Sequence, residues 1–166
     1  MWKLAVALDY VVVLFSTVLA LAVPLIDAQV LLPEAFYPMP LVQLKRWYVE
    51  EYGDYLSKEK PYFFIGLVWV EIVLLWPLSL ANVYGILTRR SWAAATSIMA
   101  GVSVATSMAA VMAELLGSGR ASEKLLQLYT PFIAFSVVAI LRGLLAGPCH
   151  APIRPPHAPS SKKKRA

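Results

Sequence analysis

The chain has 166 residues, of which 59% are hydrophobic and only 15% charged, and one domain of this length cannot bury that apolar excess, so an ordinary soluble protein is excluded. The formal net charge is +5. It comes from the residues after Pro148, which hold five basic residues and no acid, because the other ten basic residues balance the ten acidic ones. This distribution excludes nucleic-acid binding. The only cysteine and both histidines lie in the same C-terminal stretch, which excludes a disulfide framework and a Cys/His zinc site, and we expect neither metal nor cofactor.

Four long apolar runs follow one another along the chain. They cover residues 4–32, 62–87, 92–116 and 125–145. Each reaches the roughly 20 residues that a helix needs to cross the hydrocarbon layer, and helices are the open-ended structures that satisfy their backbone groups there. The sequence therefore predicts an all-α four-transmembrane-helix bundle formed by residues 1–147, followed by a basic cytosolic tail at 148–166. Pro24, Pro77 and Pro131 lie inside the runs and predict kinks.

The segment between the first two runs, residues 33–61, is rich in aromatic and charged residues and is bounded by prolines. Unstructured connections of this length are uncommon in compact domains. We expect a luminal helical segment here, lying at the membrane interface or covering the bundle as a lid.

The basic residues of the short connections predict the orientation. Arg89 and Arg90 fill the loop between the second and third runs, on the side shared by Lys3, Arg142 and the tail. Both termini are therefore expected in the cytosol, and Arg142 is expected to extend to the cytosolic surface.

The C-terminal residues Lys163 and Lys164 fit the dilysine pattern of endoplasmic-reticulum retention. The alternative is a polybasic tail that is attracted to anionic lipid. We predict residence in the endoplasmic-reticulum membrane.

Two acidic residues are the strongest functional signal, because a carboxylate inside the membrane is expected to be paired, protonated or directed into a cavity. Glu71 lies in the middle of the second run, and Asp27 follows Pro24 in the first. Together they could bind a cationic amine. The alternative is that Asp27 caps the luminal segment and that Glu71 makes a structural hydrogen bond. Asp54, in the luminal segment, has a solvated or capping role as its default.

The third run is rich in small residues, which favours close helix packing. Trp69, Trp76, Tyr129 and Phe132 could form the wall of a pocket and offer cation–π contacts. The apolar runs contain no His, Lys or Cys that could act in nucleophilic catalysis, so we identify no catalytic residue.

Several motifs occur in the order that is typical of one family. They are DAQVLLPEAFYP at Asp27–Pro38, LKRWYVEEYGDYL at Leu44–Leu56, Glu71 six residues before Pro77, LYTPF at Leu128–Phe132, and an arginine at the end of the fourth run. The chain resembles the sigma-2 receptor (transmembrane protein 97) family over residues 4 to about 145. That family shares the EXPERA domain with the emopamil-binding protein, a sterol isomerase.

The resemblance implies a four-helix protein of the endoplasmic reticulum that binds sterols and lipophilic amines in an intramembrane pocket and acts in sterol homeostasis or trafficking. It also implies a homodimer in contact with membrane lipid, and a partner among sterol-transport membrane proteins. The ligand-binding acids of the family fall on Asp27 and Glu71, its supporting luminal acid on Asp54, and its pocket aromatics on Tyr129 and Phe132.

Three positions depart from the family pattern. Leu75 stands where the receptor has a glutamine, Phe132 where it has a tyrosine, and Ser103 where it has a histidine. These changes imply a less polar pocket. Two alternatives to a non-enzymatic receptor stay open, a sterol isomerase of the emopamil-binding type and a membrane adaptor or chaperone without a ligand.

Overall fold

The structure, a computed structural model, describes residues 2–146, and within that range it is an all-helical bundle. Four segments are long and apolar enough to cross a membrane: Leu4–Val30, Tyr62–Leu87, Ala93–Ser118 and Glu123–Ala146. These segments agree closely with the four predicted runs. The tail at 148–166 and its proposed retention signal, Lys163 and Lys164, lie outside the described residues.

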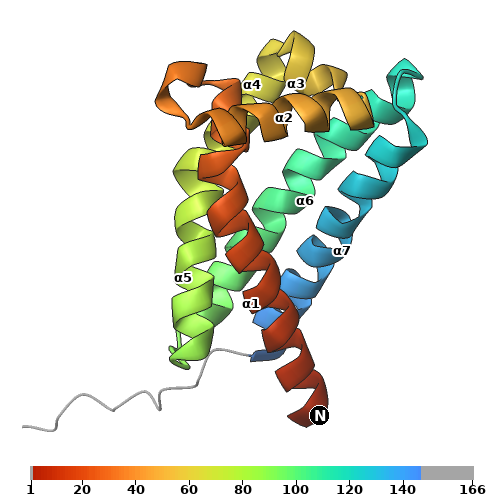
Figure 1. Ribbon diagram of the computed structural model, residues 1–166. Coiled ribbons are helices and arrows are strands. Elements are labelled where there is room, and N and C mark those ends of the chain that lie inside the picture. Colours follow the sequence, from red (N-terminus) through yellow and green to blue (C-terminus); the bar gives the residue numbers. More distant parts are fainter. Residues whose placement is uncertain (1, 147–166) are drawn as a thin grey trace, which may run out of the picture.

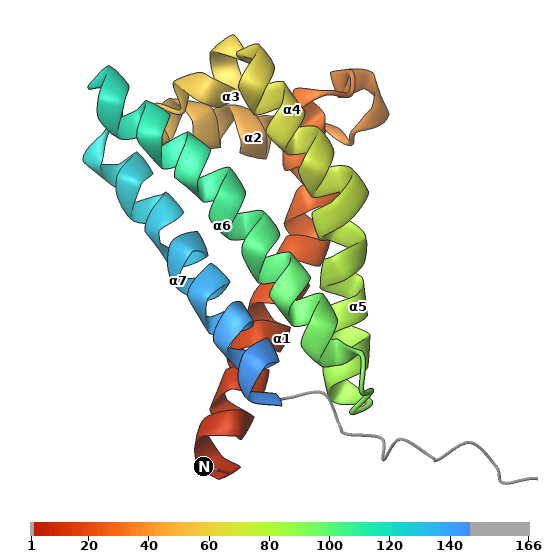
Figure 2. The same ribbon diagram turned by 180° about the vertical axis from the view of Figure 1, so that it is seen from behind.

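The spans are built from single or broken helices. The first is α1 (Trp2–Leu25) followed by the 3-10 turn η1 (Asp27–Val30); the second is α4 (Tyr62–Val70), the π-helical turn η3 (Glu71–Leu75) and α5 (Trp76–Leu87). The third and fourth are the long helices α6 (Ala93–Ser118) and α7 (Glu123–Ala146). Figures 1 and 2 show these helices close together at one end of the bundle and spread apart at the other.

The close packing of α6 on α7 depends on two glycines. A β-carbon added at Gly101 would lie 2.8 Å from the Ser136 carbonyl oxygen, and one added at Gly143 would lie 2.6 Å from that of Ala94. The two helices therefore approach each other at backbone distance, as the small residues of the third run predicted.

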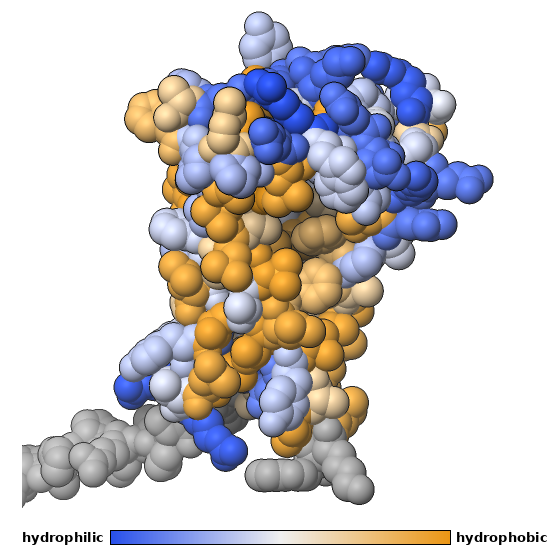
Figure 3. Space-filling model, in the orientation of Figure 1, coloured by the Kyte–Doolittle hydropathy of each residue, from blue (hydrophilic) through white to orange (hydrophobic). Residues whose placement is uncertain are grey.

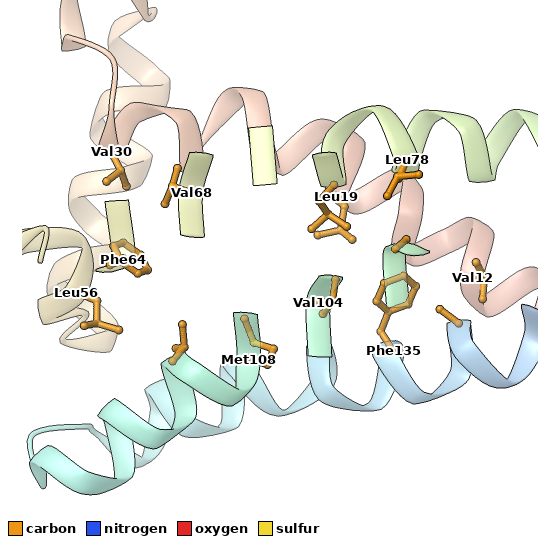
Figure 4. Packing of buried hydrophobic residues seen from close by; sticks show 14 of the residues in the cluster. Val12, Leu19, Val30, Leu56, Phe64, Val68, Leu78, Val104, Met108 and Phe135 are labelled. Atoms are coloured by element: carbon orange, nitrogen blue, oxygen red, sulfur yellow. The ribbon is translucent and has the colours of Figure 1, made fainter. Parts of the chain in front are cut away.

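The outer surface of the bundle is apolar. Large hydrophobic side chains such as Tyr10, Leu14 and Val73 are exposed. Figure 3 shows a mainly hydrophobic band between more hydrophilic ends. Inside the bundle, side chains of α1 and α4 point toward those of α6 and α7 (Figure 4). This arrangement fits a protein whose outer surface faces lipid.

A helical cap covers the wide end of the bundle (Figure 1). It consists of the 3-10 turn η2 (Glu34–Phe36), α2 (Met39–Tyr52) and α3 (Tyr55–Glu59). Gly53, in the left-handed conformation with φ of 66°, ends α2. The side chain of Asp54 then accepts hydrogen bonds from two backbone N–H groups at the start of α3. The predicted helical lid is thus present, as two helices.

The cap is fastened to the bundle by hydrogen bonds. The Tyr55 hydroxyl lies 2.8 Å from Ser118 Oγ in α6, and Ser122 Oγ donates to the Tyr52 carbonyl at 2.6 Å. On the opposite side, Lys60 Nζ donates to the carbonyl of Val30 in η1 at 2.8 Å. The cap is therefore tied to both sides of the wide end.

The prediction that Arg142 reaches the membrane surface is wrong. Its side chain is only 10% exposed, and Nε donates to Asp9 Oδ1 at 2.9 Å. Nη1 donates to the Ala93 carbonyl at 2.8 Å and to Ser97 Oγ at 3.2 Å. Because α1, α6 and α7 converge at this end (Figure 2), the guanidinium meets acceptors inside the bundle and need not extend to water.

Candidate functional site: an acid-lined cavity beneath the cap

Pro24 bends the first span just before Asp27. Proline has no N–H, so the Ala20 carbonyl loses its usual helical donor. The indole Nε1 of Trp76, in the second span, donates to that carbonyl at 3.0 Å, and the hydroxyl of Tyr37 donates to the Pro24 carbonyl at 3.1 Å. The chain then continues into the turn η1, whose first residue is Asp27.

The second span is interrupted by the π-helical turn η3, which begins at Glu71. The backbone N–H of Trp76 donates to the Glu71 carbonyl, five residues earlier. This wider turn precedes Pro77, whose ring would clash with the Val73 carbonyl of a regular helix. Asp27 and Glu71 therefore each lie where a span is interrupted close to a proline.

A cavity of about 180 Å³ lies beneath the cap. A water molecule requires roughly 10–15 Å³ by this measure, so the space admits a ligand of many atoms. All five residues predicted from the sequence line it: Asp27, Asp54, Glu71, Tyr129 and Phe132. The remaining wall is mainly apolar and comes from the four spans and the cap, including Leu19, Val30, Phe64, Val68, Val104 and Met108, which Figure 4 labels.

The three acids have different surroundings. Asp54 is 1% exposed, and its carboxylate accepts from Leu56 N, Ser57 N, Ser57 Oγ and the Tyr48 hydroxyl at 2.6–3.2 Å. Its acceptor sites are occupied by the cap itself. By contrast, no donor within residues 2–146 hydrogen-bonds to Asp27 or Glu71, and neither forms an ion pair there. These two carboxyls are therefore available to a ligand.

Lys45, in α2, lines the same cavity and was not predicted. Burial and the nearby Lys60 lower the pKa of Lys45 to about 8, against the opposing effect of Asp27, Asp54 and Glu34. Its spacing of three residues from the buried Val42 could have revealed its inward position. The cavity thus contains its own cation.

Tyr48, three residues after Lys45, also lines the cavity. Burial and the Asp54 carboxylate raise the pKa of its hydroxyl. The hydroxyl therefore remains a protonated donor, directed at Asp54 at 3.2 Å.

Two aromatic rings of α7, Tyr129 and Phe132, line one wall, and Phe15 of α1 packs against Phe132 outside the cavity lining. Phe132 packs edge-on against Phe15 with ring centres 5.8 Å apart, and Tyr129 lies 6.4 Å from Phe132. Trp69 and Trp76 do not line the cavity but are partly exposed on the outer surface.

Two of the three departures from the family pattern touch the cavity. Leu75 and Phe132 line it and contribute carbon surface, whereas Ser103 lies elsewhere. The hydroxyl of Ser103 is buried and has no hydrogen-bond partner within residues 2–146.

Residues 40–143, more than half of the chain, match the family described as EBP: EXPERA (EXPanded EBP superfamily). The chain belongs to the EXPERA family. It is also similar to "Sigma intracellular receptor 2" of Xenopus tropicalis, with 26% identity over 135 residues that cover 74% of this chain and 79% of the frog protein. The proteins of the same name from Macaca fascicularis and Homo sapiens are each 28% identical over 91 residues, which cover 54% of this chain and 52% of the relative.

The chemistry available to this EXPERA protein is limited by its donor set. No group of three His, Cys, Asp or Glu side chains within residues 2–146 could hold a metal ion. The cavity offers two carboxyls open to a ligand, one lysine and two tyrosines, among apolar walls. Such a set suits the binding of an apolar molecule with one basic or hydrogen-bonding group.

Proposed function

We propose that the protein is a non-enzymatic intramembrane receptor for sterols and lipophilic amines, acting in sterol homeostasis or trafficking. The observation that carries the proposal is that Asp27 and Glu71 line a mainly apolar cavity and that their carboxyls accept no hydrogen bond from the described residues. A ligand ammonium or hydroxyl would supply that donor, and a carboxylate paired with an ammonium gives a strong, charge-assisted hydrogen bond. The similarity to proteins named as an intracellular receptor supports this assignment.

The cellular setting that we propose is the endoplasmic-reticulum membrane, with both termini cytosolic. The arginines of the loop between α5 and α6 support this orientation. We further propose a homodimer in contact with membrane lipid and with a sterol-transport membrane protein.

An isomerase would have to move a proton on the sterol, and the EXPERA assignment makes this the second candidate. Both histidines of the chain, at positions 150 and 157, follow the fourth span in the sequence and are outside the described residues. A carboxyl would have to act alone. Incubating the purified protein with a sterol and analysing its double bonds by gas chromatography should show no shifted product.

The test of the receptor is Asp27→Asn. Loss of one partner of a buried charge pair costs about 2–5 kcal/mol, so amine affinity should fall roughly 30-fold or more. Glu71→Gln should have a smaller effect, because the amide can still donate a hydrogen bond. Binding of a labelled amine and of a neutral sterol is measured on the same preparations.

Glu50→Gln, in the exposed part of α2, is the matched control and should leave both affinities unchanged. Two outcomes contradict the proposal. Amine affinity of Asp27→Asn within about threefold of the unsubstituted protein would remove the counter-ion role, and equal losses for amine and sterol would make the acid structural.

A further inference from the structure

A second cavity lies at the narrow end of the bundle, far from the cap. Its volume is about 250 Å³, and its walls come from α1, the loop between α5 and α6, the start of α6, and the end of α7. The charged side chains in its lining are Arg89, Arg90, Arg142 and Asp9. Since Asp9 already pairs with Arg142, the cavity has two guanidinium charges that it does not balance itself.

Two of the three arginines, Arg90 and Arg142, are held in place by the surrounding structure. Arg142 is fixed by its bonds to Asp9, Ala93 and Ser97. Arg90 Nη2 donates to the Tyr84 hydroxyl at 3.0 Å, and its guanidinium lies 5.7 Å from the Tyr84 ring centre. A fixed guanidinium loses little side-chain entropy when it binds a phosphate through its paired N–H donors. The start of α6 adds the positive end of its helix dipole.

An apolar groove adjoins this cavity. The two share Ala5, Asp9, Arg142 and Ala146. The rest of the groove is lined by Leu4, Leu8 and Leu145, on the lipid-facing sides of α1 and α7. A basic recess joined to an apolar groove matches a ligand with a negatively charged head and a hydrocarbon chain.

The position along the membrane supports the same ligand class. The apolar segments end at Leu87 and begin again at Ala93, so the loop with Arg89 and Arg90 lies at the level of the lipid head groups. Figure 3 shows hydrophilic surface at this end, next to the hydrophobic band. Basic pockets at this level attract the head groups of anionic lipids.

We propose that the narrow end binds an anionic phospholipid, with its phosphate among Arg89, Arg90 and Arg142 and an acyl chain along the groove between α1 and α7. Two unbalanced positive charges favour a phosphomonoester, which carries close to two negative charges at neutral pH. Phosphatidic acid should therefore bind more tightly than phosphatidylserine, and phosphatidylcholine most weakly. This site is independent of the proposed sterol and amine cavity.

The experiment compares these three lipids, in short-chain form, by native mass spectrometry of the purified full-length protein. Arg89→Gln with Arg90→Gln should weaken phosphatidic acid binding by roughly 25-fold, because each of the two basic residues near the membrane surface contributes roughly fivefold. Lys163→Ser with Lys164→Ser removes the same charge from the tail and should leave binding unchanged. Thermal unfolding of each variant in detergent shows that it is folded, independently of any ligand of the cavity beneath the cap.

A charge-preserving variant keeps the test valid if the glutamine variant does not fold. Arg89→Lys with Arg90→Lys retains both charges but loses the paired donors, so phosphatidic acid binding should still weaken severalfold. Free glycerol 3-phosphate has the head without the chains and should bind far more weakly than the lipid. Four outcomes would overturn the proposal. Phosphatidic acid binding could fall equally in the arginine and tail variants, or stay unaltered in the lysine variant. The three lipids could also bind equally well, or glycerol 3-phosphate could bind as tightly as phosphatidic acid.

Discussion

The three carboxyls in the cavity beneath the cap differ in the hydrogen-bond donors around them. Asp54 is surrounded by donors from its own cap, whereas Asp27 and Glu71 have none within residues 2–146. A satisfied buried carboxylate contributes to stability, and an unsatisfied one is free to bind a ligand at a cost to stability.

This difference predicts opposite effects on stability. Asp54→Ala removes a helix cap and leaves buried donors unpaired, so it should destabilise the protein by about 1–3 kcal/mol. Asp27→Asn should leave the melting temperature unchanged or raise it. Thermal unfolding of both variants in detergent without ligand is the measurement, and a larger loss for Asp27→Asn would reverse the two roles.

Lys45 predicts a pH dependence of amine binding. With a pKa of about 8 it is charged at pH 7, where it repels a cationic ligand, and it loses this charge as the pH rises above 8. The charged groups around it are Lys60, Asp27, Asp54 and Glu34. A quaternary ammonium ligand keeps its own charge throughout. This ligand should bind Lys45→Met more tightly than the unsubstituted protein, and the difference in affinity should be largest at pH 7.

The ratio of the two affinities should approach one above about pH 9, since the lysine is then neutral in the unsubstituted protein. Comparing the variants at each pH cancels the titration of the other acids. A ratio that does not change between pH 7 and pH 9 would show that Lys45 does not act on the ligand through its charge.

At the scale of elements, the bends of the first two spans are connected. The Ala20 carbonyl, without its helical donor because of Pro24, accepts from Trp76 directly after the π-helical turn. This hydrogen bond joins the interrupted parts of both spans and so holds Asp27 and Glu71 beside one cavity.

The connection predicts a non-additive pair of substitutions. Trp76→Phe should destabilise the protein by about 0.6–1.7 kcal/mol, the range for hydrogen bonds between membrane helices. Pro24→Ala restores an N–H that can satisfy Ala20, so Trp76→Phe should cost less in that background. A double-mutant cycle by thermal unfolding measures the difference. Strict additivity would mean that the two residues are not coupled.

Hydropathy and residue spacing predicted the elements well but not their breaks. The four spans follow from apolar length, and the cap from the aromatic segment between prolines. The π-helical turn could not be predicted, because Pro77 indicates that the helix is distorted but not which kind of distortion it adopts. The inward position of Lys45 and the pairing of the buried Arg142 guanidinium with the half-exposed Asp9 depend on how helices converge, which no local pattern encodes. The assignment of Asp27 and Glu71 came from their charge inside apolar runs.

At the scale of the whole molecule, the tail is separate from the bundle in sequence and charge. Changing Lys163 and Lys164 to serine should release the protein from the endoplasmic reticulum toward later compartments, as seen by microscopy of a tagged chain. The bundle should still bind amines as before. Unchanged location would favour the alternative, in which the tail is held by anionic lipid.

The two ends of the molecule are closed by ion pairs of different kinds. At the narrow end the buried Arg142 guanidinium pairs with Asp9, which is 44% exposed, whereas at the cap both partners of the Arg120–Glu59 and Lys124–Glu51 pairs are at least 44% exposed. Dissolved ions screen exposed pairs far more than buried ones. The cap end is therefore the part of the protein whose closure responds to ionic strength, and a ligand that left beneath the cap would have a residence time that depends on the salt concentration on that side of the membrane.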